Sequence, residues 1–171
     1  MPIKNTISRQ LHNTNAEEIV QMPASVPVPN VISTKPYKAF WTSTYKGKVN
    51  GKPMSDWTQW AGENQMLKQN NFILTPKSKV KLLEINTADE FDRVKKVQKD
   101  FGIMQRYVID FAWYYNHGFD GIHVTWNAIA ETRWNDHNKM GLDYCSDTLT
   151  FWDTECTCWF NLDWVKKIER I

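Results

Sequence analysis

The sequence predicts an α+β fold in which short strands build a mixed β-sheet core and helices are inserted between them. The chain of 171 residues is long enough to bury roughly 70% of its unfolded surface as one domain. Apolar residues occur mainly in short runs typical of strands, and segments with helical spacing follow capping residues between those runs. We therefore expect a single domain over residues 1–171.

The first third of the chain is expected to be mostly extended. We predict a strand over 3–11, a short helix over 16–21, an extended connector over 23–30, a strand over 38–42 and a loop over 46–53. Three prolines exclude a helix from the connector, because proline removes a backbone donor and clashes with the preceding turn. Two glycines favour the loop.

A helix is predicted to begin at Ser55. Serine is a favourable N-cap, and Asp56 then lies in the first turn, where the helix dipole favours negative charge. Five residues follow at helical spacing: Trp57, Trp60, Ala61, Asn64 and Leu67. We expect this helix to bury a stripe of tryptophans.

The remaining elements follow from similar patterns. We predict strands over 72–74, 80–85, 121–125, 148–152 and 156–160, helices over 87–101 and 105–116, and a long irregular region over 126–144. The helix over 87–101 begins with a capping-box sequence and continues with Phe91, Val94, Val97 and Phe101.

Composition bounds the function only loosely. The formal net charge is +2, with acidic and basic residues interspersed, which neither requires nor excludes a nucleic-acid partner. Three clustered cysteines do not form the even, dispersed set of a secreted disulfide scaffold. We see no signal peptide and no apolar segment of about 20 residues, so we expect a cytoplasmic protein without a membrane partner. Nine tryptophans predict that any pocket has aromatic walls.

Three segments together resemble the ADP-ribosyltransferase superfamily. Residues 11–17, LHNTNAE, are similar to the start of that family, where a His or Arg closes the first strand. Residues 40–45, FWTSTY, resemble its aromatic-x-Ser-Thr-Ser strand, and residues 152–155, WDTE, resemble its Glu-x-Glu or Gln-x-Glu motif. The segments occur in the family's order. Residues 55–60 and 119–125 add a likeness to bacterial and bacteriophage members.

This resemblance implies a split mixed sheet and an enzyme that cleaves the bond between nicotinamide and ribose in NAD. It implies that Glu155 stabilises the oxocarbenium-like transition state as the main catalytic residue. His12 would bind the ribose of the adenosine half, with Arg9 as the alternative. Three strand residues, Thr42, Ser43 and Thr44, would brace the cleft and position the carboxylate. Tyr45 or, equally, Trp57 would stack on nicotinamide.

Asp153 departs from the family pattern, because Glu or Gln usually stands two positions before the catalytic glutamate. Asp153 is one methylene shorter, so the resemblance leaves the acceptor open between protein and nucleic acid. A toxin-like or host-modifying role, a neutralising partner protein and NAD glycohydrolase activity with water as acceptor are all compatible with it. The first motif also mixes features of two subclasses.

Other interpretations of the same residues remain. A lone glutamate is usually an exposed strand-end residue, although the apolar neighbours of Glu155 favour a special role. The aromatic cleft could belong to a non-catalytic module that binds a nucleotide or a protein. A zinc site could be built from Cys156, Cys158, Cys145 and His137. The spacing is unlike that of zinc knuckles, and we expect no metal.

Overall fold

The computed structural model describes residues 3–20, 28–29, 35–37, 39–101, 104–138, 149 and 152–171, and its centre is an eight-stranded sheet. In spatial order the strands of this sheet are β1 (Ile3–Lys4), β9 (Leu82–Ile85), β12 (Gly121–Val124), β13 (Cys156–Trp159), β5 (Phe40–Thr44), β2 (Gln10–Thr14), β8 (Asn70–Pro76) and β14 (Val165–Arg170). β9 and β12 are parallel, and the other neighbouring pairs of this sheet are antiparallel.

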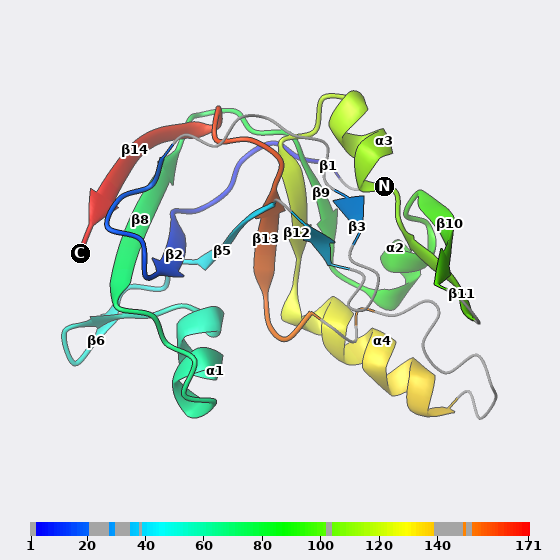
Figure 1. The fold of residues 1–171 in the computed structure, drawn as a ribbon, viewed down its shortest axis with the longest axis horizontal. Helices are drawn as coiled ribbons and strands as arrows, with labels where there is room; N and C mark the ends of the chain where they lie inside the picture. Colours follow the sequence, from blue (N-terminus) through cyan, green and yellow to red (C-terminus); the bar gives the residue numbers. More distant parts are fainter. Residues whose placement is uncertain are drawn as a thin grey trace.

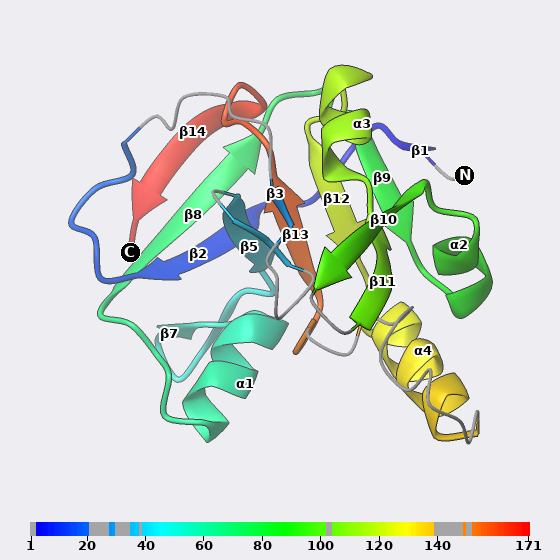
Figure 2. The ribbon, with the colours of Figure 1, turned by 45° about the vertical axis from the view of Figure 1, so that its right-hand side comes forward.

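The other described elements surround this sheet. Three two-stranded hairpins are β3 (Val28–Pro29) with β4 (Pro36–Tyr37), β6 (Lys48–Val49) with β7 (Lys52–Pro53), and β10 (Lys96–Phe101) with β11 (Met104–Ile109). The helices are α1 (Asp56–Glu63), α2 (Ala88–Asp92), α3 (Phe111–Asn116) and α4 (Trp126–Asn138). α2, α3 and α4 lie beside the half of the sheet that contains β9 and β12, whereas α1 lies below β2, β5 and β8 (Figures 1 and 2). The predicted α+β class is confirmed.

β5 joins the two halves of the sheet. Its first three residues pair with β13, and its last two, Ser43 and Thr44, pair with Leu11 and Gln10 of β2. Beyond Leu11, β2 continues along β8 without pairing to β5. The two strands therefore diverge at His12, and this divergence positions the pocket described below.

Two clusters of buried apolar side chains pack on the sheet. The larger one, which includes Ile85, Ile122 and Val124, lies against residues of α2, α3 and α4. The smaller one is centred on Trp159 and Trp164, whose rings stack with centroids 3.6 Å apart. Along β9 and β13, neighbouring side chains point to opposite faces, so Leu82 and Trp159 join the smaller cluster while Leu83 and Cys158 join the larger one.

Several predicted elements are confirmed with shifted ends. The helix capped by Ser55 is present, and its capping box is completed by Thr58, but it ends at Glu63 rather than continuing to 67. Gln65 follows with a positive φ of 56°, which takes the backbone out of the helix. The buried strands predicted over 121–125 and 156–160 are β12 and β13. Those predicted over 72–74, 80–85 and 38–42 are β8, β9 and β5.

The predictions for the first third of the chain need correction. The strand over 3–11 is divided into β1 and β2, which lie in different parts of the sheet. Residues 16–20 form bends and irregular backbone rather than a helix. The loop over 46–53 contains the β6–β7 hairpin. Of the connector over 23–30, the structure describes only 28–29, which form β3.

Two predicted helices are largely strand. The helix over 87–101 is restricted to α2, and residues 96–101 form β10. The helix over 105–116 is β11 followed by α3. β10 and β11 pair in an antiparallel hairpin in which Val97 faces Val108. Pairing with a partner strand decides such segments more strongly than the helical spacing of a few apolar residues.

The irregular region predicted over 126–144 was wrong where the structure describes it. Residues 126–138 form α4, which buries Ala128, Ile129 and Thr132 and is otherwise largely polar. Its sequence shows little helical periodicity, so no helix was predicted there. Of the strand predicted over 148–152, the structure describes Leu149 and Trp152, both without strand structure. β14, at residues 165–170, was not predicted.

Candidate functional site

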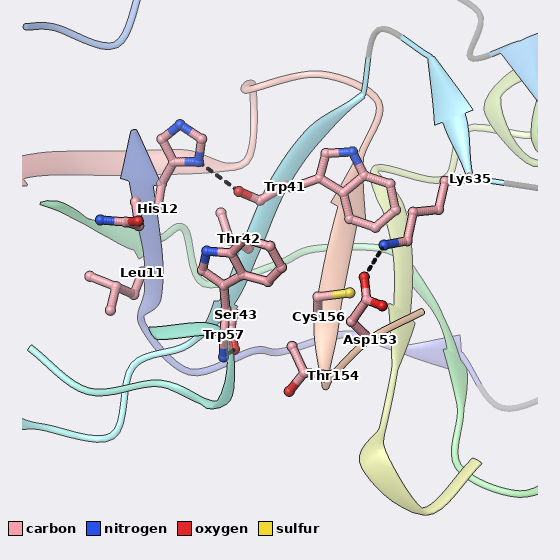
Figure 3. A pocket seen from close by; sticks show the side chains of 11 residues that line it. Leu11, His12, Lys35, Trp41, Thr42, Ser43, Trp57, Asp153, Thr154 and Cys156 are labelled. Atoms are coloured by element: carbon pink, nitrogen blue, oxygen red, sulfur yellow. Dashed lines mark hydrogen bonds and ion pairs between the residues drawn. The ribbon is translucent and has the colours of Figure 1, made fainter. Parts of the chain in front are cut away.

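A pocket of about 260 Å³ lies where β2 and β5 diverge (Figure 3). Its lining residues are Leu11, His12 and Asn13 of β2; Trp41, Thr42 and Ser43 of β5; Trp57 of α1; Lys35, which precedes β4; and Asp153, Thr154 and Cys156. In the view of Figure 3, His12 and Leu11 lie on one side of the pocket and Lys35 and Asp153 on the other. The segments that carried the family resemblance therefore meet at one pocket.

Glu155 does not itself line this pocket; its carboxylate lies behind Ser43, which does. Ser43 donates to Oε2 of Glu155 at 2.7 Å, and the backbone N–H of Thr44 donates to the same oxygen at 3.1 Å. The Thr44 hydroxyl donates to Oε1 at 2.9 Å. Both carboxylate oxygens are thus acceptors, as in the ionised form. These bonds offset the cost of burying a carboxylate that is only 7% exposed.

The chain places Glu155 at this point because it directly precedes β13, which pairs with β5. Trp152 and Thr154, just before it, are buried, so packing fixes the backbone segment that leads into β13. The pairing of Thr157 with Thr42 then sets Glu155 opposite the end of β5. Strand register therefore brings together a carboxylate and hydroxyls that are 111 and 112 residues apart in the sequence.

His12 forms one wall of the pocket. Its Nδ1 lies 2.7 Å from the Trp41 carbonyl oxygen, and since a carbonyl only accepts, Nδ1 carries the proton and donates. Burial lowers the pKa of His12 below its usual value, against the opposing effect of this hydrogen bond. The neutral ring therefore has Nε2 as an acceptor. Among the described residues, Nε2 of His12 has no hydrogen-bond partner.

Lys35 and Asp153 form an ion pair across the other side of the pocket. Lys35 Nζ lies 2.8 Å from Oδ2 of Asp153, and both side chains are partly exposed. Nζ also lies 5.8 Å from the centre of the Trp41 ring. The pocket therefore presents a cation beside an aromatic ring, and Asp153 is engaged by a residue of the same chain.

Two tryptophans supply the aromatic surface of the pocket. Trp41 packs edge-on against the buried Trp152, with ring centroids 5.1 Å apart. Helical spacing favoured the core for Trp57 and Trp60, with a pocket-lining role second; both are only partly buried, and Trp57 lines the pocket. The short α1 turns one side toward the cleft rather than into a core, which is why the helical spacing misassigned this residue.

A second hollow of about 380 Å³ adjoins the first, and His12 and Trp41 line both. Its other lining residues are Thr14, Ala16, Glu18, Ile19, Val20, Ala39 and Phe40. Phe40 packs on His12 with ring centroids 4.2 Å apart. The site therefore consists of two adjacent hollows that share His12 and Trp41 as lining residues.

Three of the expected cofactor-binding residues do not line the pocket: Arg9, Thr44 and Tyr45. Arg9 and Tyr45 stack on each other, with the guanidinium carbon 5.0 Å from the ring centroid, and neither lines the pocket. Of the alternatives that the sequence left open, His12 rather than Arg9 and Trp57 rather than Tyr45 reach the pocket. Thr42 lines it too, but its hydroxyl binds Gln10 Oε1 at 2.7 Å instead of Glu155.

Sequence reasoning did not select His123, Thr157, Gln10 or Lys35. His123 Nδ1 lies 2.8 Å from the Thr157 hydroxyl and 3.5 Å from Oε1 of Glu155. The one available signal was a histidine in the middle of an apolar strand, which implies a buried partner. Lys35 gave no signal, because a lone lysine after a proline-rich segment is usually exposed.

The cysteines do not form a metal centre with other described residues. Over the described part of the chain, no group of three or more His, Cys, Asp or Glu side chains is arranged to hold a metal ion. Burial raises the pKa of the Cys156 and Cys158 thiols, which keeps both protonated. Cys145 and the side chain of His137 lie outside the described residues.

Neither a membrane-spanning helix among the described residues nor a similar known protein helps to identify the function. In the part of the chain that the structure describes, no helix has both the length and the apolar character needed to cross a membrane. Comparisons with protein-family models, curated proteins and solved structures find no match to this chain. The relationship to ADP-ribosyltransferases therefore stays a prediction, and the site must be interpreted from its own chemistry.

Proposed function

We propose that the protein is an NAD-dependent ADP-ribosyltransferase. It would act in the cytoplasm of the producing cell or of a host cell, as a single domain with the split sheet of that family. Glu155 is its main catalytic residue, and the acceptor is a macromolecule. The observation that carries this proposal is the buried carboxylate of Glu155 held by Ser43 and Thr44 behind an aromatic pocket. The proposal joins this geometry to the family resemblance of the three segments.

A fixed carboxylate suits this reaction. When the bond between the ribose C1′ and nicotinamide breaks, its electron pair leaves with nicotinamide and positive charge develops on the ribose. A negative charge already oriented toward that ribose stabilises the transition state more than the ground state. The acceptor then donates an electron pair to C1′ and releases its proton. In this proposal the ribose enters beside Ser43 and donates a hydroxyl proton to Glu155.

Two adjacent hollows suit the two halves of a dinucleotide better than one small substrate. Pockets for drug-sized ligands measure roughly 300–1,000 Å³; the first hollow, of about 260 Å³, is smaller than that, and the second, of about 380 Å³, is near the low end. Nicotinamide would lie against Trp57 and Trp41, whose flat rings suit stacking. Nε2 of the neutral His12 could accept a proton from a hydroxyl of the second ribose. Lys35 is suitably charged for the phosphates.

Asp153 is proposed to assist the acceptor. Its carboxylate pairs with Lys35 in the free protein and could accept the proton that the acceptor releases. Phosphates that attract Lys35 would free Asp153 for this role. The acceptor is either a protein side chain or a nucleobase, and water in its place gives NAD hydrolysis.

Nicotinamide release from NAD tests the proposal. Purified wild type and Glu155→Gln are compared with and without cell lysate, and labelled products are treated separately with protease and nuclease. We expect wild type to release nicotinamide and Glu155→Gln to be slower by roughly 100- to 1,000-fold. Label that protease removes identifies a protein acceptor, and label that nuclease removes identifies a nucleic acid.

Ser43→Ala is the companion variant. It removes the 2.7 Å hydrogen bond but leaves the carboxylate, so we expect a smaller loss in kcat, on the order of tenfold. Ser8→Ala, at an exposed residue outside the pocket, is the matched control. Thermal unfolding of each variant separates lost activity from lost folding. No NAD consumption by the folded wild type, with or without lysate, would exclude the enzyme.

A non-catalytic binding module is the second candidate. It is favoured by the low exposure of Glu155 and by the engagement of Asp153 with Lys35. Such a module would bind a nucleotide or a protein in the same aromatic cleft. Calorimetric binding of NAD without turnover, unchanged in Glu155→Gln but weakened in Trp57→Ala, would favour this function over the enzyme.

A further inference from the structure

A row of buried polar side chains crosses four neighbouring strands behind Glu155. Gln10 of β2, Thr42 of β5, Thr157 of β13 and His123 of β12 are all nearly inaccessible to solvent. Strand register sets Thr42 opposite Thr157, and Thr157 opposite His123. Buried polar groups of this kind are costly unless each is hydrogen-bonded.

The donors and acceptors of this row fix its direction. The Trp159 indole N–H donates to the Thr42 oxygen at 2.7 Å, so the Thr42 proton is free to bind Gln10 Oε1, also at 2.7 Å. Thr157 donates its own proton to the same Gln10 oxygen at 3.2 Å. The Thr157 oxygen must then accept from Nδ1 of His123, 2.8 Å away. His123 is therefore the donor at the end of the row.

Two routes connect this row to the carboxylate. The Gln10 amide nitrogen lies 3.5 Å from the Thr44 hydroxyl, which donates to Oε1 of Glu155 at 2.9 Å. His123 Nδ1 also lies 3.5 Å from the same Oε1. The orientation of the glutamate is thus coupled to His123 both directly and through Thr157 and Gln10.

The charges facing His123 come from three other elements. Glu155 precedes β13, Glu84 lies on β9, and Lys4 on β1 forms an ion pair with Glu84. Burial lowers the pKa of His123 below its usual value, although both carboxylates act in the opposite direction. Lys4 adds to the lowering. At neutral pH the ring is therefore uncharged and carries its proton on Nδ1.

We propose that neutral His123 is a positioning residue for Glu155, acting through Thr157 and Gln10, and that protonation of His123 switches the site to a less active form. The inference rests on the proposed transferase function. An imidazolium 3.5 Å from Oε1 would pair with Glu155 and offset the negative charge that faces the developing cation on the ribose. A neutral ring holds the carboxylate without neutralising it.

Variants of His123 separate positioning from simple packing. The amide nitrogen of His123→Asn occupies nearly the place of Nδ1 and does not titrate, whereas His123→Leu removes the donor. We expect His123→Leu to lower kcat about tenfold, with KM within about twofold. His123→Asn should keep kcat within about twofold at pH 8 and remain active at acid pH, where wild type loses activity.

Thr157 gives a second, milder test should His123→Leu fold poorly. Thr157→Val keeps the shape but removes the hydroxyl, and Thr157→Ser keeps the hydroxyl. We expect Thr157→Val to lower kcat about fivefold and Thr157→Ser to restore it. If Thr157 has only a structural role, Thr157→Val should lower the unfolding temperature and the activity together and leave the pH profile of the activity unchanged.

Nuclear magnetic resonance of the imidazole nitrogens keeps this test separate from that of the proposed function. We expect wild-type His123 to carry its proton on Nδ1 at pH 7.5, and Glu155→Gln to lower its titration midpoint further. If both are observed but no NAD is consumed, the coupling stands and the transferase function fails. If wild type turns over NAD, and both His123→Asn and His123→Leu show the same kcat and the same acid limb of the pH profile as wild type, the positioning role is overturned.

Discussion

Lys35 is the lysine that lines the pocket, and its pairing with Asp153 sets the charge of that wall. We predict that Lys35→Ala raises KM for NAD about three- to tenfold, with kcat within about twofold, because an anionic dinucleotide loses one favourable charge. The pair is partly exposed, so stability should change by less than about 1 kcal/mol. Steady-state kinetics and urea unfolding measure the two effects.

Lys46→Ala is the matched control for Lys35→Ala. Lys46 also pairs with an aspartate, Asp56, but it lies on an exposed surface outside the pocket. We expect its KM to equal that of wild type. An equal rise of KM in both variants would show a general effect of net charge and contradict a binding role for Lys35.

The residues selected by the family resemblance do not all lie at the pocket. The resemblance selected Glu155 and Ser43, and the structure brings them to within 2.7 Å of each other. It also selected Arg9 and Tyr45, which stack on each other outside the pocket. A motif fixes residue types along the chain, but the divergence of two strands decides which side chains face the cleft.

At the scale of elements, β12 and β13 approach so closely that Gly121 has no room for a side chain. A Cβ at this position would lie 2.4 Å from the Cys158 carbonyl oxygen, which is backbone and cannot move cheaply. We predict that Gly121→Ala destabilises the protein by at least about 2 kcal/mol, since relief requires a shift of one strand. Urea unfolding of the purified variant measures this loss.

Gly62→Ala provides the comparison for that substitution. Gly62 is an exposed residue of α1, and an added Cβ would only make an ordinary contact, 3.5 Å from Leu67 Cδ1. Because alanine favours helices over glycine, we expect this variant to be more stable by about 0.5–1 kcal/mol. A loss of stability equal to that of Gly121→Ala would indicate that the close approach of the strands is unimportant.

The helices and strands differ in how well they could be predicted from their own sequences. α1 was predictable because Ser55 caps it and Thr58 completes the capping box, both local contacts. α4 was not, because its sequence shows little helical periodicity. β10 and β11 were mistaken for helix because each is extended by pairing with the other, which no local pattern records.

At the scale of the whole molecule, two buried histidines couple stability to pH. Burial lowers the pKa of both His12 and His123, so each binds a proton more readily in the unfolded chain. Their contribution to stability is therefore full above the unfolded pKa of about 6.5 and is lost as pH falls below it. We predict that the free energy of unfolding decreases from pH 7.5 to pH 5.5, by up to about 1.4 kcal/mol per pH unit for each histidine.

Urea unfolding across that pH range measures the dependence, and His123→Asn is the informative variant. It cannot titrate, so its unfolding free energy should change less with pH than that of wild type. An unfolding free energy for wild type that stays constant from pH 7.5 to pH 5.5 would contradict the burial of neutral histidines.

The sequence by itself determined the α+β class, the capped helix and the buried strands around residues 121–125 and 156–160, because caps and apolar runs are local properties. It also supplied Glu155 and the hydroxyl-rich strand as candidates. Only the tertiary structure decided that β5 pairs with β13 and then with β2, and so that Ser43 and Thr44 hold Glu155. The pairing of β12 with β13 places His123 beside that carboxylate. Contacts between strands more than 100 residues apart depend on register, which no local sequence pattern specifies.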